Sequence, residues 1–176
     1  MNTLIIIDMQ NDFLSEGRLP VTSLERELEI IDYINLISPN YDLTIATQDF
    51  HPPHHVSFAS THRMNVGESI WINDVEQVLW PDHCIMRTEG AAIHPEIAAV
   101  DYHVYKGSDP MVDSYSGFFD AKGNDLFILR ELCRGSNVVD VVGVATDYCV
   151  KYTVLDGLEL GLPMRVLTQG IEGVMN

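Results

Sequence analysis

Short apolar runs alternate with stretches of helical period along this chain. Residues 4–7 (LIII) and 138–145 (VVDVVGVA) are rich in β-branched residues, which is typical of strands buried on both faces. Residues 23–36 carry apolar side chains at helical spacing behind an opening that resembles a capping box, which predicts a helix. Further strands are expected at residues 42–48, 103–106 and 164–168, and further helices at 126–133 and 147–159.

The order of these elements predicts an α/β protein. Because strands alternate with helices, we expect a three-layer Rossmann-like fold with a mostly parallel central sheet and helices on both faces. Residues 50–97 interrupt the alternation with an irregular stretch rich in His, Pro, Gly and Trp. Long loops of this kind in compact domains are usually functional.

Composition narrows the class of protein further. The 176 residues are 46% hydrophobic and 20% charged, which suits one globular domain over residues 1–176. The net charge of −16 would repel polyanions, so we do not expect nucleic acid as a partner. No apolar run approaches the ~18 residues needed to cross a membrane, and no basic segment precedes the first strand as in a secretory signal.

The three cysteines, Cys84, Cys133 and Cys149, are odd in number and far apart in the sequence. A disulfide framework is therefore a poor interpretation, and a reducing cytoplasm is the better one. The sequence gives no argument for a role of Cys84 or Cys133.

Polar residues of different chemistry follow the predicted strands at their carboxyl ends. They are Asp8, Asp49, His51, Lys106 and Cys149. In an open parallel sheet, ligands collect beyond these ends. An acid, a base and a thiol at one edge of the sheet favour an active site there.

Cys149 lies in the segment ATDYCV, at a predicted turn from strand to helix. The helix N-terminus favours the thiolate, and a nearby Lys106 would lower the pKa of the thiol further. Backbone N–H groups of this turn could receive a developing oxyanion, and Asp8 could take the thiol proton. The alternative is structural, with a buried cysteine, a capping aspartate and a solvated lysine.

A second group of residues is rich in histidine. His51 follows Asp49 at i+2, which places both on one side of an extended segment. A carboxylate with two or three imidazoles suits zinc, iron or manganese, and the pattern does not discriminate among them. A histidine-rich loop without a metal is the alternative. The same irregular stretch also contains His54, His55, His62 and His83.

Taken together, these segments resemble the nicotinamidase branch of the isochorismatase-like cysteine hydrolases. The matches occur in family order over nearly the whole chain: IDMQNDF (7–13), TQDFHPPHHVSFA (47–59), QVLWPDHC (77–84), YKG (105–107), YSGF (115–118) and VGVATDYCV (142–150). IDMQNDF alone marks only the superfamily, whereas WPDHC with the D-x-H segment and the ATDYCV cysteine is much more specific. The resemblance implies a metal-dependent hydrolase that converts nicotinamide to nicotinate and ammonia through a thioester, in NAD salvage.

The resemblance also implies roles for individual residues. The catalytic triad would be Asp8, Lys106 and Cys149, and the oxyanion hole would be the N–H groups of Ala145 and Cys149, beside a cis peptide between Val144 and Ala145. One divalent metal ion, with zinc expected first, would be held by Asp49, His51 and His83, with His55 as the candidate for a further ligand. The walls of the substrate pocket would be Phe13, Trp80, Tyr115 and Tyr148, although ordinary core packing stays open for Tyr115.

Partners and rival functions follow from the same resemblance. Pyrazinamide is expected as a second small-molecule substrate, and a homo-oligomer is expected because relatives often self-associate. A carbamoyl or ureido amidohydrolase would share the triad but usually lacks the full metal set, and an inactive metal-binding scaffold is a further alternative. A vinyl ether hydrolase is disfavoured because Cys149 occupies the nucleophile position.

The chain departs from the family pattern at two places. Arg87 stands where a small residue, usually glycine, is expected. The sequence ends at GVMN, so we expect the domain to be short at the C-terminus by about one helix and one strand.

Overall fold

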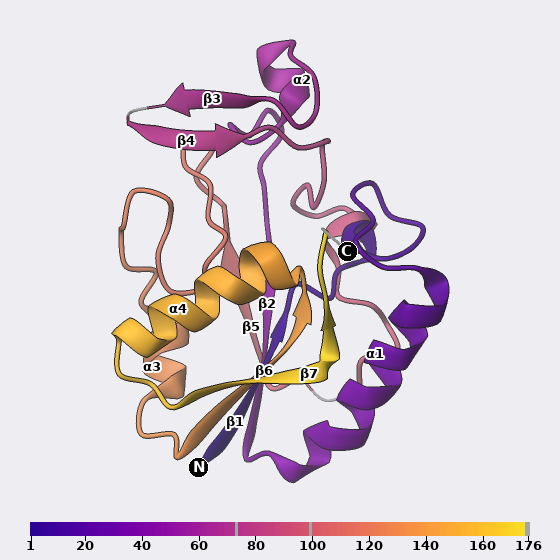
Figure 1. Cartoon of the computed structure of the whole chain (residues 1–176), viewed down its shortest axis with the longest axis vertical. Helices are drawn as coiled ribbons and strands as arrows, with labels where there is room; N and C mark the ends of the chain where they lie inside the picture. The colour runs from indigo at the N-terminus through magenta and orange to yellow at the C-terminus, as the bar shows by residue number, and fades with distance from the viewer. Residues whose placement is uncertain (73, 99, 175–176) are drawn as a thin grey trace.

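The computed structural model describes residues 1–72, 74–98 and 100–174 (Figure 1). The strands are β1 (Asn2–Ile7), β2 (Leu43–Asp49), β3 (Ser69–Ile72), β4 (Val75–Val78), β5 (Tyr102–Lys106), β6 (Val138–Val144) and β7 (Met164–Glu172). The α-helices are α1 (Leu24–Ile37), α2 (Ala59–His62), α3 (Ile128–Cys133) and α4 (Lys151–Glu159). Short 3-10 turns are η1 (Asn11–Phe13), η2 (Ser38–Asn40) and η3 (Glu89–Ala91), and η4 (Thr146–Val150) is a π-helical turn.

Five strands form the central sheet in the order β5-β2-β1-β6-β7, and each neighbouring pair is parallel. The strands at the centre are the apolar, β-branched runs that a doubly covered sheet requires. Helix α1 covers one face of the sheet, and α3 and α4 cover the other (Figure 1). The α/β fold predicted from the sequence is therefore confirmed.

The side chains of β1 alternate between the two halves of the core. Leu4 and Ile6 pack in the cluster that contains Ile30 of α1. Ile5 and Ile7 pack in the opposite cluster, which contains Leu129 of α3. Because all four strand side chains are fully buried, β1 is fixed in register on both faces and its carboxyl end is rigidly placed.

Several details differ from the sequence prediction. The irregular stretch contains a small antiparallel hairpin, β3–β4, and the short helix α2, which lie beyond the carboxyl ends of the central strands (Figure 1). Strand β7 continues to Glu172, past the predicted end at residue 168. Only half of the expected capping box forms. The hydroxyl of Ser23 accepts a hydrogen bond from the backbone N–H of Arg26, but residue 26 is not a glutamate, so no side chain returns the second hydrogen bond of a capping box.

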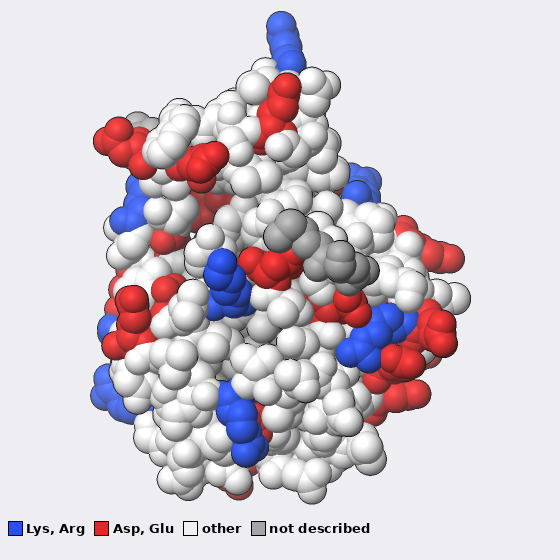
Figure 2. Space-filling model, viewed as in Figure 1, with Lys and Arg blue, Asp and Glu red and all other residues white. Residues whose placement is uncertain are grey.

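Charged side chains are scattered over the surface, and a few charged side chains are buried. On the face in Figure 2, red acidic side chains are scattered with blue basic ones between them. Asp8, Asp49 and Lys106 are instead buried, at the carboxyl edge of the sheet. In the described part of the chain, no helix is both long enough and apolar enough to cross a membrane.

Candidate active site

Four parallel strands deliver the candidate catalytic side chains to one edge of the sheet. Asp8 follows β1, Asp49 ends β2 and Lys106 ends β5. Asp49 and Lys106 are register partners on neighbouring strands, so their side chains start from adjacent positions. Cys149 lies in the turn η4, directly after β6. The clustering at this edge is what the order of the elements predicts.

Lys106 is the centre of this cluster. Its Nζ lies 2.8 Å from Oδ2 of Asp8, forms a short ion pair with Oδ1 of Asp49, and lies 3.5 Å from Sγ of Cys149. The same ammonium donates to the carbonyl of Ser114 at 3.2 Å. With an exposure of only 1%, Lys106 cannot be the solvated surface lysine of the alternative interpretation.

Burial and neighbouring charge set the protonation of these groups. Burial opposes the charge of Lys106, but the carboxylates of Asp49 and Asp8 outweigh it and raise the lysine pKa well above its usual value. Burial also opposes ionisation of Asp49, yet Lys106 and His51 hold the pKa of that carboxyl well below its usual range. For Asp8 the balance is reversed, because burial together with the charge of Asp49 raises its pKa despite Lys106.

The sequence predicted a lowered pKa for the thiol of Cys149, and this prediction is wrong. Burial raises the pKa of Cys149 well above its usual value, and Asp8 and Asp49 add to the effect. Lys106 acts in the predicted direction but does not overcome them. A raised thiol pKa favours a mechanism in which a nearby base takes the proton as the sulfur attacks.

The turn that carries Cys149 has the expected backbone. The peptide between Val144 and Ala145 is cis, as the family resemblance implied. The N–H groups of Tyr148 and Val150 both donate to the carbonyl of Ala145 at 3.1 Å, which tightens the turn at the start of α4. Cys149 is 5% exposed and faces the pocket, where a substrate carbon can approach it.

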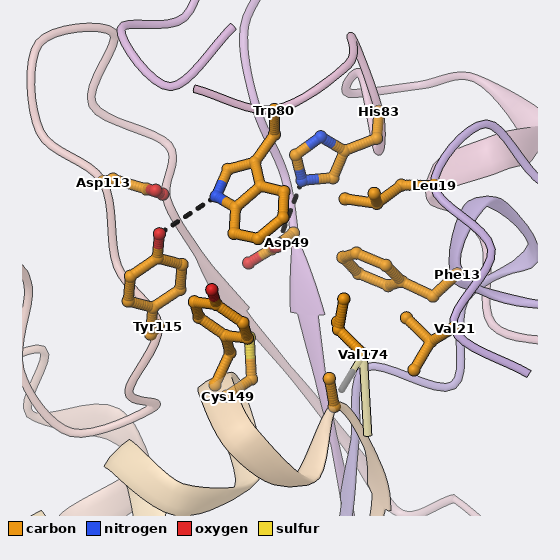
Figure 3. Close-up of a pocket in the computed structure, with 12 residues that line it drawn as sticks. Phe13, Leu19, Val21, Asp49, Trp80, His83, Asp113, Tyr115, Cys149 and Val174 are labelled. Atoms are coloured by element: carbon orange, nitrogen blue, oxygen red, sulfur yellow. Dashed lines mark hydrogen bonds and ion pairs between the residues drawn. The ribbon is translucent and has the colours of Figure 1, made fainter. Parts of the chain in front are cut away.

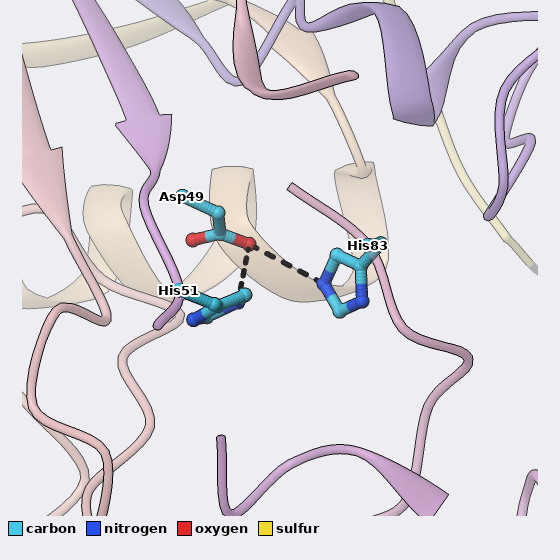
Figure 4. A group of neighbouring side chains, drawn as sticks. All are labelled: Asp49, His51 and His83. Carbon is cyan, nitrogen blue, oxygen red and sulfur yellow. Dashed lines mark ion pairs between the residues drawn. The ribbon is translucent and has the colours of Figure 1, made fainter. Parts of the chain in front are cut away.

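Asp49, His51 and His83 form a compact set of metal-type donors (Figure 4). Oδ2 of Asp49 lies 3.5 Å from Nε2 of His51 and 3.8 Å from Nε2 of His83. Nδ1 of His51 bonds to the carbonyl of Gly107 at 2.8 Å, and Nδ1 of His83 bonds to the carbonyl of Pro81 at 2.7 Å. A carbonyl only accepts, so each Nδ1 carries a proton and Nε2 is the ring nitrogen left to ligate a metal ion. This donor set fits a divalent metal ion.

His55 and the carboxylate of Asp113 extend this set on the far side of His51. Donor atoms of His51, His55 and Asp113 lie within 4.8 Å of one another, and the rings of His51 and His55 stack at 4.1 Å. Burial, followed by the charge of His51, lowers the pKa of His55 to about 4, so it is a neutral ligand candidate. His55 groups with Asp113 rather than with Asp49 and His83. The neighbouring His54 is exposed.

A pocket opens beside the thiol and the donor set (Figure 3). All four predicted wall residues line it, and Tyr115 accepts a 3.0 Å hydrogen bond from Nε1 of Trp80. Phe13 packs against His83 with ring centroids 5.3 Å apart. The pocket is also lined by four residues that were not predicted from the sequence, namely Leu19, Val21, Asp113 and Val174. Leu19 and Val21 follow the first motif closely, but nothing in the sequence pattern marks Asp113 or Val174.

Two further residues bear on the sequence expectations. Gln10 is fully buried and brackets Asp49, donating from Nε2 to its carbonyl and accepting from its N–H at Oε1, both at 2.8 Å. Arg87 has a φ of 65°, in the left-handed region that favours glycine, which explains the small residue expected at that position.

Comparison with known proteins gives one family. The isochorismatase domain matches residues 2–174. The nicotinamidase of Escherichia coli is 40% identical over 97% of this chain and 83% of its own length. Among solved structures, a nicotinamidase/pyrazinamidase of Acinetobacter baumanii has a TM-score of 0.93 at 34% identity, covering 99% of this chain and 86% of that one. A pyrazinamidase of Pyrococcus horikoshii in complex with zinc has a TM-score of 0.77 at 31% identity, covering 98% and 87%.

Proposed function

This chain belongs to the isochorismatase domain family, in its nicotinamidase branch, and from that premise we propose that it hydrolyses nicotinamide to nicotinate and ammonia with the help of a bound divalent metal ion. One observation carries the proposal. The Cys149 thiol and the donors Asp49 and His83 line the same pocket, whose remaining walls are largely apolar and aromatic. A flat heteroaromatic amide needs all three features together.

The first step is attack by sulfur on the carboxamide carbon. Asp8 takes the proton of the thiol as the C–S bond forms, and the electron pair of the carbonyl moves to oxygen. The raised pKa of Asp8 suits a group that must accept and then release a proton. Lys106, between both groups, keeps the developing negative charge balanced.

The second step breaks the C–N bond. Asp8 returns the proton to the departing nitrogen, ammonia leaves, and the nicotinoyl group stays attached to Cys149 as a thioester. Asp8 then takes a proton from water as the water oxygen attacks the thioester carbon. The C–S bond breaks, the proton passes from Asp8 to sulfur, and nicotinic acid leaves and ionises to nicotinate. Backbone N–H groups of Ala145 and Cys149 would hold the oxyanion in both halves of the reaction.

The metal ion would be held by Asp49, His51 and His83, with zinc as the first candidate and iron or manganese as alternatives. When bound, it supplies a Lewis-acid site for the ring nitrogen of the substrate and thereby orients the ring. His55 is the candidate for a further ligand, and its donor atom lies within 4.8 Å of those of His51 and Asp113. Bond formation and proton transfer at the amide would be carried out by Cys149 and Asp8, next to Lys106.

The aromatic walls fix the plane of the substrate ring. Trp80 and Tyr148 meet edge to face at 5.0 Å, and Tyr115 lies 5.3 Å from Tyr148. Phe13 closes the opposite side of the pocket (Figure 3). A ring held between these groups places its carboxamide toward Cys149 and its nitrogen toward the donor set.

The test is ammonia release from nicotinamide by the purified protein, compared with Cys149→Ala and with a chelated sample. We expect release by the wild-type protein only, and recovery of the chelated sample when Zn²⁺, Fe²⁺ or Mn²⁺ is added back. A folded, metal-loaded wild-type protein that releases no ammonia from nicotinamide would overturn the proposal. Release from a ureido compound instead would favour the carbamoyl amidohydrolase alternative.

A further inference from the structure

Asp12 is a buried carboxylate that does not line the substrate pocket. It is 6% exposed and lies in η1, one residue before the wall residue Phe13. Asp12 has no role in the proposed reaction. Its contacts nevertheless lead directly to the metal donors.

The Asp12 carboxylate binds the peptide bond that follows His83. Its Oδ2 accepts a 2.7 Å hydrogen bond from the N–H of Cys84, and that N–H belongs to the peptide joining His83 to Cys84. The carbonyl of Cys84 in turn accepts from the N–H of His51 at 3.0 Å. One residue, Cys84, thus connects the backbones of both histidine donors, and Asp12 anchors it from the other side.

The backbone at Cys84 needs such an anchor. Its φ is 46°, a left-handed conformation that a cysteine adopts at some cost, and the residue is fully buried. A buried N–H in this position would lose a hydrogen bond to a charged acceptor if the carboxylate were removed. The peptide would then be free to rotate, and with it the His83 ring.

The surrounding chain makes room for the carboxylate. A Cβ placed on Gly90 would lie 2.2 Å from Oδ2 of Asp12, so a side chain at residue 90 is incompatible with the observed carboxylate position. Gly90 lies in η3, which packs against η1. The anchor can therefore be displaced in two independent ways, by changing Asp12 or by filling the space at Gly90.

We propose that Asp12 is a positioning residue for the metal site: its carboxylate holds the His83–Cys84 peptide so that Nε2 of His83 faces Asp49. This inference rests on the proposed metal binding. It assigns to the buried acid of the IDMQNDF motif an effect on metal affinity, transmitted through the backbone rather than by ligation. Outer-shell partners of metal ligands typically change affinity by about 10–100-fold.

The experiment measures Zn²⁺ and Co²⁺ affinity by competition with a chromophoric chelator, together with the thermal midpoint of each variant. Asp12→Ala and Gly90→Ala should bind metal roughly 10–100-fold more weakly than wild type, and Asp12→Asn, which keeps one acceptor oxygen, should lose less. Asn11→Ala is the matched control. Its side chain also ties this loop to η3, donating to the carbonyl of Glu89 at 2.8 Å, but it does not contact the His83–Cys84 peptide.

A second readout separates positioning from general loosening of the pocket. If Asp12 acts through the metal, saturating Zn²⁺ should restore kcat/KM of Asp12→Asn to near the wild-type value. Unchanged metal affinity in folded Asp12→Asn and Gly90→Ala would overturn the inference, and so would an equal loss in Asn11→Ala. A wild-type protein that binds neither Zn²⁺ nor Co²⁺ would instead overturn the proposed metal site. Failure of the inference about Asp12 and failure of the proposed metal binding are therefore distinguishable.

Discussion

The hydroxyl of Thr47 donates a 2.7 Å hydrogen bond to Oδ1 of Asp8, while Nζ of Lys106 lies 2.8 Å from the other oxygen, Oδ2. Thr47 sits opposite Ile7 in the β1–β2 register and is fully buried. Each oxygen of the Asp8 carboxylate therefore has one partner. The backbone of Asp8 has a φ of 48°, in the left-handed region. This arrangement orients Oδ2 toward the ammonium that also faces the thiol.

Thr47→Val should therefore slow turnover while leaving the fold intact. The change removes a hydrogen bond to a charged group, about 1.5–3 kcal/mol, and kcat should fall by roughly 10–100-fold if Asp8 is the proton carrier. Thr47→Ser keeps the hydroxyl and should recover most of the rate. Kinetics of ammonia release would check this, with metal affinity as a control expected to stay constant. Equal kcat in the Val and Ser variants would show that the hydroxyl does not position Asp8 for catalysis.

Gly107→Ala should weaken metal binding through His51. A Cβ at residue 107 would lie 2.5 Å from Cε1 and 2.8 Å from Nδ1 of the His51 ring, and the ring depends on the Gly107 carbonyl for its orientation. We expect a loss of metal affinity of about 10-fold or more, measured by chelator competition.

The control for this variant is Gly123→Ala. Gly107 and Gly123 both have positive φ, at 62° and 79°, but a Cβ on Gly123 meets nothing within 4 Å. Each substitution should lower the unfolding free energy by about 1 kcal/mol through the backbone alone. Only Gly107→Ala should release metal, and similar affinities in both variants would contradict the contact with His51.

Much of this fold could be predicted because the signals are local. The strands β1 and β6 are buried on both faces, so their sequences are mostly apolar, with Asp140 as the one charged residue in β6. Asp8, Asp49 and Lys106 could be grouped from sequence because parallel strands bring their carboxyl ends to one edge. The β3–β4 hairpin could not be predicted, because its two strands are only four residues long each, are mostly half-buried or exposed, and carry no sustained apolar pattern.

The rest depends on packing between segments that are distant in sequence. The pKa of Cys149 is raised mainly by burial, which cannot be read from the sequence. The sequence indicates only Lys106, whose charge lowers that pKa. Val174 enters the pocket because its N–H bonds to Oδ1 of Asp147, in the turn that carries the thiol. Asp113 meets His51 and His55 only in the folded chain, so no spacing rule could place it beside them.

Away from the site, Asp140 should contribute stability that depends on pH. It is fully buried in β6 and accepts from Tyr41 at 2.5 Å and from Nε of Arg165 at 2.6 Å. Burial opposes its charge, but Arg165 and Tyr41 hold its pKa below the ordinary value of 3.8. The unfolded chain then binds the proton more readily, so this contribution is complete above about pH 4 and is lost as pH falls through the folded-state pKa.

Asp140→Asn should therefore cost roughly 1–3 kcal/mol of unfolding free energy near neutral pH, and the difference from wild type should shrink toward pH 3. Urea unfolding at a series of pH values measures both quantities. A difference that stays constant down to pH 3 would mean that the ionised carboxylate is not the stabilising form.

The choice of substrate should depend on the ring nitrogen more than on ring shape. Nicotinamide and pyrazinamide both carry a nitrogen meta to the carboxamide, whereas benzamide has the same outline without it. If the ion held by Asp49, His51 and His83 anchors that nitrogen, kcat/KM for benzamide should be lower by roughly 10²-fold or more, because a site built for a polar contact rejects an analogue that lacks it. Pyrazinamide should be hydrolysed at a rate comparable to nicotinamide. After chelation, the binding affinities of the three amides should become similar, because all three are then held only by the aromatic walls. Benzamide turnover equal to that of nicotinamide in the metal-loaded enzyme would remove the metal from substrate recognition and leave Phe13 and Trp80 as the determinants of specificity.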